Sequence, residues 1–72
     1  MISYEPFWET LEKSTETTYT LIYRHGLSSS KIDRLRKNKT VNTRTINDLC
    51  RILGCNIGDI MTYIPSDEDQ FL

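Results

Sequence analysis

The chain has 72 residues and a formal net charge of −1, from 9 lysine and arginine residues against 10 aspartate and glutamate residues. A chain of this length forms one domain with a modest core, so its stability must come from efficient packing or from a partner chain. It contains no apolar run of about 18 residues that could span a membrane, and its N-terminus lacks the basic and apolar regions of a signal peptide. We therefore expect a cytoplasmic protein with no membrane partner.

The first predicted helix covers residues 4–13, with Pro6 in its first turn, where a missing N–H costs nothing. Its apolar residues follow the spacing of a core-facing stripe, i, i+3, i+4 and i+7: Tyr4, Phe7, Trp8 and Leu11. Three glutamates share the opposite face, which we expect to point away from any nucleic acid. The aromatic residues are therefore predicted to belong to the core.

Two short helices joined by a tight turn are predicted over residues 17–25 and 28–37. Gly26 is expected to end the first helix, because glycine enters the left-handed conformation without a Cβ penalty. Ser28 can then cap the second helix with its hydroxyl oxygen. A helix, a short turn containing glycine and a second helix make the helix-turn-helix pattern.

The predicted helix at residues 28–37 separates its side chains by face. At about 100° per residue, Ile32 and Leu35 point towards the core. The opposite face is polar and basic, and it consists of Ser30, Asp33, Arg34 and Lys37. In a major groove, serine can pair with several base edges, aspartate with a cytosine amino group and arginine with guanine. The alternative is the solvated face of an ordinary amphipathic helix.

Basic residues are concentrated in residues 24–44. This segment holds seven basic residues and one acid, Asp33, whereas the rest of the chain holds two basic residues and nine acids. A dipolar chain with its positive end on the helix-turn-helix suits docking on phosphate groups. We therefore favour nucleic-acid binding over chance clustering of charge.

Residues on either side of the helix at 28–37 are predicted to hold the DNA backbone. The helix that begins near Thr17 and Thr18 offers unpaired N–H groups and a positive dipole end, which can bind a phosphate oxygen. Plain capping is the alternative role of Thr17. Arg44 lies in the first turn of the next predicted helix, where a cation opposes the dipole unless a phosphate is near. Arg44 and Lys39 are therefore predicted to be phosphate clamps.

Asn42 is expected to cap a fourth helix, and Gly54 is expected to end it. A fifth helix is predicted over residues 56–64, because Asn56 can cap it and Pro65 stops it. Its apolar residues are expected to complete the core: Ile57, Ile60, Met61 and Ile64. The sequence thus predicts an all-α fold, a compact bundle of five helices.

The predicted domain spans residues 1–65, and residues 66–72 form an acidic C-terminal tail. A lone domain of this size buries little DNA surface, so we expect a homodimer on two half-sites about one helical turn apart. The fifth helix and four residues near the C-terminus are the candidates for the dimer surface: Tyr63, Ile64, Phe71 and Leu72.

Cys50 and Cys55 fall at interior positions of the predicted helices. Cysteine there behaves as a small hydrophobe, so core packing is favoured over a disulfide or a redox role. Zinc needs about four ligands, and two cysteines with His25 give no recognisable zinc spacing. No set of nucleophile and base, and no phosphate-binding glycine loop, is evident. We therefore predict no metal, no cofactor and no enzyme activity.

Three groups of residues occur in a characteristic order: Thr17-x-x-x-Leu21-Ile22, Gly26-Leu27-Ser28-x-Ser30-x-Ile32-x-Arg34-Leu35, and the run from Asn42 to Ile60. Together they resemble the Cro and lambda-repressor-like (XRE-family) helix-turn-helix DNA-binding domain over residues 4–64. The resemblance implies that the helix at about 28–37 enters the major groove and that its base-reading positions are Ser29, Ser30, Lys31, Asp33 and Arg34. It places Thr18, Lys39, Asn42 and Arg44 at the DNA backbone, and the residues themselves add Thr17 and Lys37.

The predicted function is sequence-specific binding of double-stranded DNA by a transcription regulator, with a repressor favoured. The alternative is a protein-interaction module of the same fold, such as an antitoxin or an anti-repressor partner. The acidic tail and the apolar residues at its end favour that alternative. A shift of DNA supports the first function, whereas capture of a stoichiometric protein partner without any DNA shift supports the second.

Overall fold

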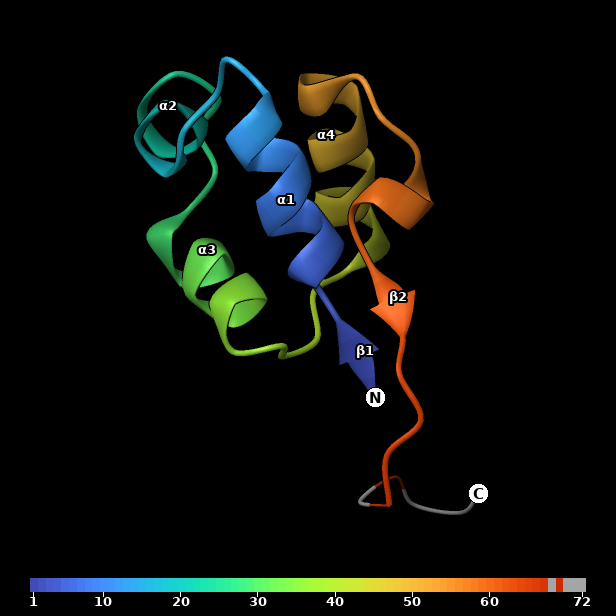
Figure 1. Cartoon of the computed structure of the whole chain (residues 1–72). Coiled ribbons are helices and arrows are strands. Elements are labelled where there is room, and N and C mark those ends of the chain that lie inside the picture. The colour runs from blue at the N-terminus through green and yellow to red at the C-terminus, as the bar shows by residue number, and fades with distance from the viewer. Residues whose placement is uncertain (68, 70–72) are drawn as a thin grey trace.

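The computed structural model describes residues 1–67 and 69, and this part of the chain holds four α-helices, a short 3-10 helix and two short strands (Figure 1). The helices are α1 (Glu5–Lys13), α2 (Thr18–Tyr23), α3 (Ser29–Arg36) and α4 (Thr43–Leu53). The 3-10 helix η1 covers Ile57–Asp59, and the strands are β1 (Ile2–Ser3) and β2 (Thr62–Tyr63). The helical bundle was predicted, and the strands were not.

The predicted fifth helix at residues 56–64 is wrong. Only η1 is helical there, and the chain then extends into β2. The backbone groups that a helix would need are bonded elsewhere: the carbonyl oxygen of Ile60 accepts from the N–H of Phe7 at 3.1 Å. The N–H of Ile64 donates to the carbonyl oxygen of Met1 at 2.8 Å. Contacts with the start of the chain therefore replace the local helical bonds.

The two strands pair antiparallel, with Ile2 opposite Tyr63 and Ser3 opposite Thr62. This pairing places the start of the chain beside the segment that follows η1 (Figure 1). It also changes which residues reach the core. Ile60 is fully buried, as expected, but Ile57 and Ile64 are 62% and 43% exposed.

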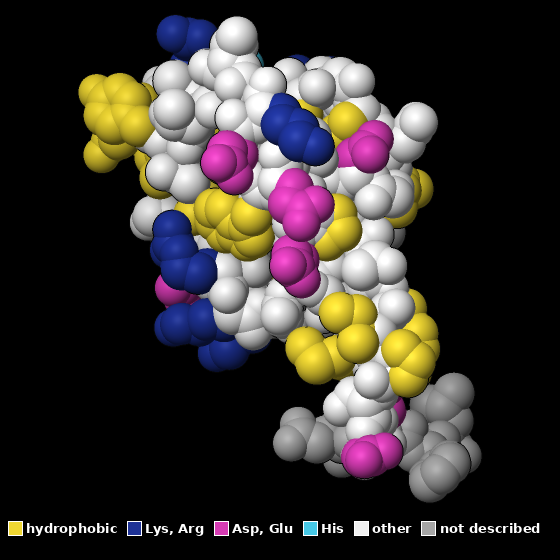
Figure 2. All heavy atoms as spheres, in the orientation of Figure 1, with side chains coloured by type: hydrophobic (Ala, Val, Ile, Leu, Met, Phe, Trp, Pro, Cys, Tyr) yellow, Lys and Arg dark blue, Asp and Glu magenta, His cyan; other side chains and the backbone are white. Residues whose placement is uncertain are grey.

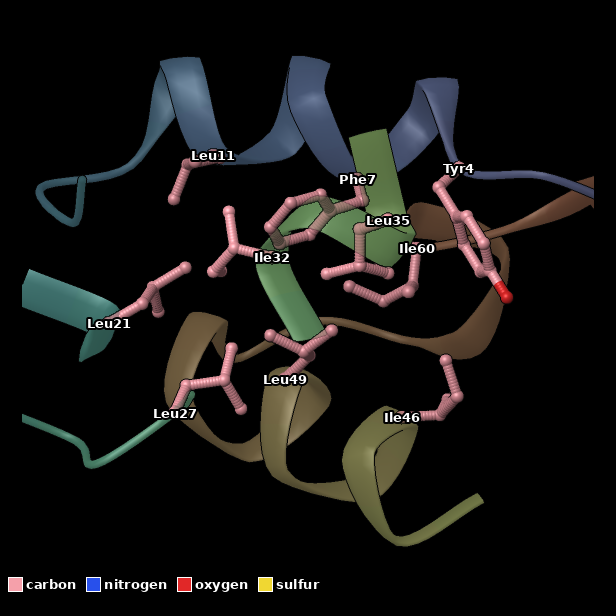
Figure 3. Packing of buried hydrophobic residues seen from close by; sticks show 10 residues of the cluster. All are labelled: Tyr4, Phe7, Leu11, Leu21, Leu27, Ile32, Leu35, Ile46, Leu49 and Ile60. Carbon is pink, nitrogen blue, oxygen red and sulfur yellow. The ribbon is translucent and has the colours of Figure 1, made fainter. Parts of the chain in front are cut away.

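The core lies between the four helices and η1 (Figure 3). The residues predicted from the apolar stripes supply most of it, and Trp8 is only partly buried at its edge. The buried cluster consists of Tyr4, Phe7, Leu11, Leu21, Leu27, Ile32, Leu35, Ile46, Leu49 and Ile60. Because both helices of the helix-turn-helix contribute, the core fixes the orientation of α3 relative to α1 and α4.

The turn between α2 and α3 forms as the sequence predicts. Gly26 has a φ of 74°, in the left-handed region, and α2 ends at Tyr23, slightly before the predicted position. The N–H of Leu27 donates to the carbonyl oxygen of Leu21 at 2.9 Å, which closes the turn. The hydroxyl oxygen of Ser28 accepts from the N–H of Lys31 at 3.3 Å and caps α3.

Replacement of Gly26 by alanine should lower the free energy of unfolding by about 1–2 kcal/mol, because an L-residue is strained at this positive φ. A Cβ atom at position 26 would meet nothing within 4 Å, so the backbone alone causes the loss. Gly58→Ala is the matched control, since its Cβ also meets nothing and its φ is not positive. Urea unfolding of both variants measures the difference. Equal stabilities would contradict the assigned role of Gly26.

Candidate nucleic-acid interface

The helix α3 presents a polar face to solvent, directly opposite its buried residues. Ile32 and Leu35 are 3% and 0% exposed, and they attach the helix to the core. On the outer side Ser29, Ser30 and Arg34 are exposed, whereas Lys31 and Asp33 are half-buried. The structure therefore confirms the prediction that this helix has one buried apolar face and one polar face towards solvent. A surface of small and charged side chains on a rigid helix is suited to a groove of DNA.

Asp33 and Lys37 form an ion pair on this outer face, with 2.9 Å between Nζ and the carboxylate oxygen. The hydrogen bond from Lys37 is the main cause that lowers the pKa of Asp33 below its ordinary value. Both side chains are about half exposed. Such a surface pair is worth little free energy, so either partner can exchange it for a contact with DNA.

Arg34 is exposed, but its guanidinium group bonds to the loop that follows α3. Its Nε donates to the carbonyl oxygen of Thr40 at 2.6 Å, and its Nη2 donates to the Thr40 hydroxyl at 3.1 Å. The sequence did not predict this contact, because it joins a helix to a loop residue six positions later. Arg34 thus holds the loop in this structure, and its predicted role in base reading has to accommodate that contact.

The loop at residues 37–42 is fixed at several points. Asn38 adopts a left-handed conformation with a φ of 55°, and its Oδ1 accepts from the N–H of Tyr4 at 2.9 Å. The N–H of Lys39 donates to the carbonyl oxygen of Arg34 at 2.9 Å. The Lys39 side chain remains exposed, so a cation lies on an ordered loop next to the end of α3.

Asn42 caps α4, as predicted. Its Oδ1 accepts from the N–H of Thr45 at 2.9 Å and from the Thr45 hydroxyl at 3.0 Å. Arg44 is exposed in the first turn of α4. Asn42 and Arg44 therefore both lie at the N-terminal end of α4, directly after the loop at residues 37–42.

The start of α2 is less suited to phosphate than the sequence indicates. Thr17 is the cap, and its hydroxyl oxygen accepts from the N–H of Thr20 at 3.2 Å; Thr18 is half-buried. A carboxylate that the prediction overlooked, Glu16, accepts from the Thr20 hydroxyl at 2.7 Å and lies 3.2 Å from Nε2 of His25. The Thr20 bond is the largest cause that lowers the pKa of Glu16. This negative charge beside α2 opposes an approaching phosphate.

Basic side chains are most numerous over α3 on the face of the molecule that Figure 2 shows. On the same face, several Asp and Glu side chains lie over α1. Arg36, which the sequence did not single out, has its guanidinium carbon 5.4 Å from the centre of the Trp8 ring. Through this cation–π contact Arg36 packs against α1. The other basic residues of α3 remain on its outer face.

Residues 7–66 match the model of the Cro/C1-type helix-turn-helix DNA-binding domain. The chain belongs to this family. The crystal structure of the transcriptional regulator VanUg is similar to this Cro/C1-type domain, with a TM-score of 0.80 and 29% sequence identity. That similarity covers 90% of this chain and 87% of the VanUg chain. No protein of curated function matches the sequence.

The Cro/C1-type domain has neither a candidate membrane span nor a candidate metal cluster among the residues that the structure describes. Among its described residues, no helix is long and apolar enough to cross a bilayer. Across the same residues, no group of three or more His, Cys, Asp or Glu side chains could hold a metal ion.

Asn42→Asp should keep the stability of this domain and weaken its binding to DNA of any sequence. Aspartate retains the oxygen that caps α4, but it removes the amide donor and adds a negative charge at a position that is predicted to contact phosphate. Asn42→Ala should instead lower the free energy of unfolding by about 1–2 kcal/mol, since it removes the cap. Thermal unfolding and DNA titration separate the two effects. Wild-type affinity in Asn42→Asp would limit Asn42 to capping.

Proposed function

We propose that this chain is a sequence-specific regulator of transcription that inserts α3 into the major groove of double-stranded DNA and acts as a repressor by occluding its operator. The observation that carries the proposal is the exposed polar face of α3, followed directly by an ordered loop with an exposed cation. Membership of a DNA-binding family supports it, as does the similarity to a structure described as a transcriptional regulator.

The proposed contacts divide into base readers and backbone clamps. Serine, lysine, aspartate and arginine on α3 would meet base edges, at Ser29, Ser30, Lys31, Asp33 and Arg34. The backbone contacts would come from Thr17, Thr18, Lys37, Lys39, Asn42 and Arg44. Of these, Lys39 and Arg44 have the strongest support, because Lys39 is exposed on the loop and Arg44 is exposed in the first turn of α4 that follows it. Thr17 has the weakest, because its hydroxyl already caps α2 beside Glu16.

We also propose that two copies bind a pseudo-palindrome, with half-sites about one helical turn apart. The predicted fifth helix cannot supply the dimer surface, since it does not form. Tyr63 in β2 and Ile64 directly after it remain candidates, being 61% and 43% exposed. Phe71 and Leu72 lie outside the described residues, and so does much of the tail that would favour a protein-interaction module.

A binding assay with a library of genomic fragments, run at two salt concentrations, tests the proposed function. We expect a small set of fragments to be retained, with affinity that falls steeply as salt rises, because binding releases counterions from phosphate. No retention at low salt would contradict DNA binding, and affinity that does not depend on salt would contradict the phosphate contacts. Capture of a stoichiometric protein partner without any DNA retention would support the interaction module instead.

Lys39→Ala should weaken binding to all DNA sequences about equally and lower the salt slope by about one unit, because it removes one phosphate contact. Lys13→Ala is the matched control, since Lys13 is exposed at the end of α1 and away from the loop. Titrations at several salt concentrations give both slopes. A wild-type slope for Lys39→Ala, or the same loss in Lys13→Ala, would contradict the clamp.

A further inference from the structure

The two cysteines lie next to each other at the end of α4. Gly54 caps this helix in the left-handed conformation, with a φ of 63°. The reversal lets the N–H of Cys55 donate to the carbonyl oxygen of Cys50 at 3.0 Å. Burial, and after it the charge interaction with neighbouring Cys50, raises the pKa of the Cys55 thiol above its ordinary value. The turn at Gly54 therefore brings Cys55 back beside Cys50.

Both thiols line the same groove, between α4 and η1. The groove has a volume of about 680 Å³, and its lining includes Ile46, Ile57 and Asn56 besides the two cysteines. Both cysteines are half-buried and not sealed in the core. Core packing, the role that the sequence favours, explains their apolar surroundings. It does not require both cysteines to line the same open groove.

We propose that Cys50 and Cys55 form a dithiol site that binds one trivalent arsenical through both sulfur atoms. An arsenical of the form R–As(OH)₂ fits the number of ligands present, because the centre needs two sulfurs and keeps its own organic group. Zinc would need about four ligands, and no cluster of three candidate ligands exists in the described part of the chain. Soft thiolate ligands prefer soft centres.

The reaction balances without an oxidant. Each thiol forms one S–As bond, and its proton leaves with one hydroxide of the arsenical, so that two water molecules are released. Arsenic stays trivalent and neither sulfur is oxidised. Disulfide formation, in contrast, needs an external oxidant. The groove leaves room for the organic group of the arsenical beside Ile57.

The test uses phenylarsine oxide and the reduced full-length chain. We expect mass spectrometry to show one arsenical per chain, with both thiols lost to titration by a thiol reagent. The adduct should survive an excess of a monothiol and be released by a dithiol such as 2,3-dimercaptopropanol. Cys50→Ser and Cys55→Ser each keep one thiol, and we expect them to hold the arsenical at least about 10²-fold more weakly, because the second bond is no longer intramolecular.

Two results would overturn the proposal. One is the binding of two arsenicals per wild-type chain, which would mean that the thiols react separately. The other is an adduct on the wild-type chain that an excess of a monothiol removes, which would mean that only one sulfur holds the arsenical. Both results are read on the wild-type chain, so they hold even if a serine variant folds poorly. Neither depends on whether the chain binds DNA.

Discussion

Leu35→Ala should lower the free energy of unfolding by about 2–5 kcal/mol, through the lost transfer energy of the side chain and the cavity that remains. Leu35 is completely buried. Figure 3 shows it among the labelled core residues, near Phe7 of α1 and Ile60. A domain of this length has a total stability of only about 4–11 kcal/mol. The variant should therefore lose a large share of its stability, and α3 should no longer be held in a fixed position.

Urea unfolding, followed by the fluorescence of the single tryptophan, measures this loss. Trp8 lies 4.8 Å from the ring of Phe7, centre to centre, so its emission should report the packing of α1. Leu35→Met is the matched control, since a swap of similar volume should cost less than about 1.5 kcal/mol. If alanine and methionine had the same small effect, Leu35 could not be filling the core as the structure shows.

The helix-turn-helix could be predicted because its signals are local. The cap at Ser28, the glycine at position 26 and the apolar pair on α3 all act within one helical turn, and the structure confirms each. The same holds for α4, where Asn42 and Gly54 mark the two ends. Capping and periodicity are properties of neighbouring residues, so a single sequence contains them.

The missed features depend on partners that are distant in the sequence. Asn56 and Pro65 are valid local signals for a helix, yet backbone bonds from Phe7 to Ile60 and from Ile64 to Met1 favour the extended strand. Local propensity is a weak preference that tertiary bonds override. The bond from Arg34 to Thr40 was missed for a related reason. A long side chain can reach a loop whose course the sequence does not specify.

Arg34→Ala should weaken binding to the specific operator by about 1–3 kcal/mol and relax the base preference at one position. The bonds to Thr40 use the N–H of Nε and one of the two N–H groups of Nη2, so both N–H groups of Nη1 and the second one of Nη2 can still approach a base edge. In this arrangement the loop orients the guanidinium, which reduces the entropy lost when it meets guanine. Titration against the operator and against variants of each base pair measures both effects.

Thr40→Val separates base reading from support of the loop. Valine removes the hydroxyl that accepts from Nη2 but keeps the backbone carbonyl that accepts from Nε. If Arg34 reads a base, Thr40→Val should keep the base preference that Arg34→Ala loses. If Arg34 only holds the loop, Arg34→Ala should weaken all sequences alike, as Lys39→Ala is expected to do, and Thr40→Val should show part of the same loss. The distinction depends on specificity rather than affinity, because only a contact with a base edge can favour one base pair over another.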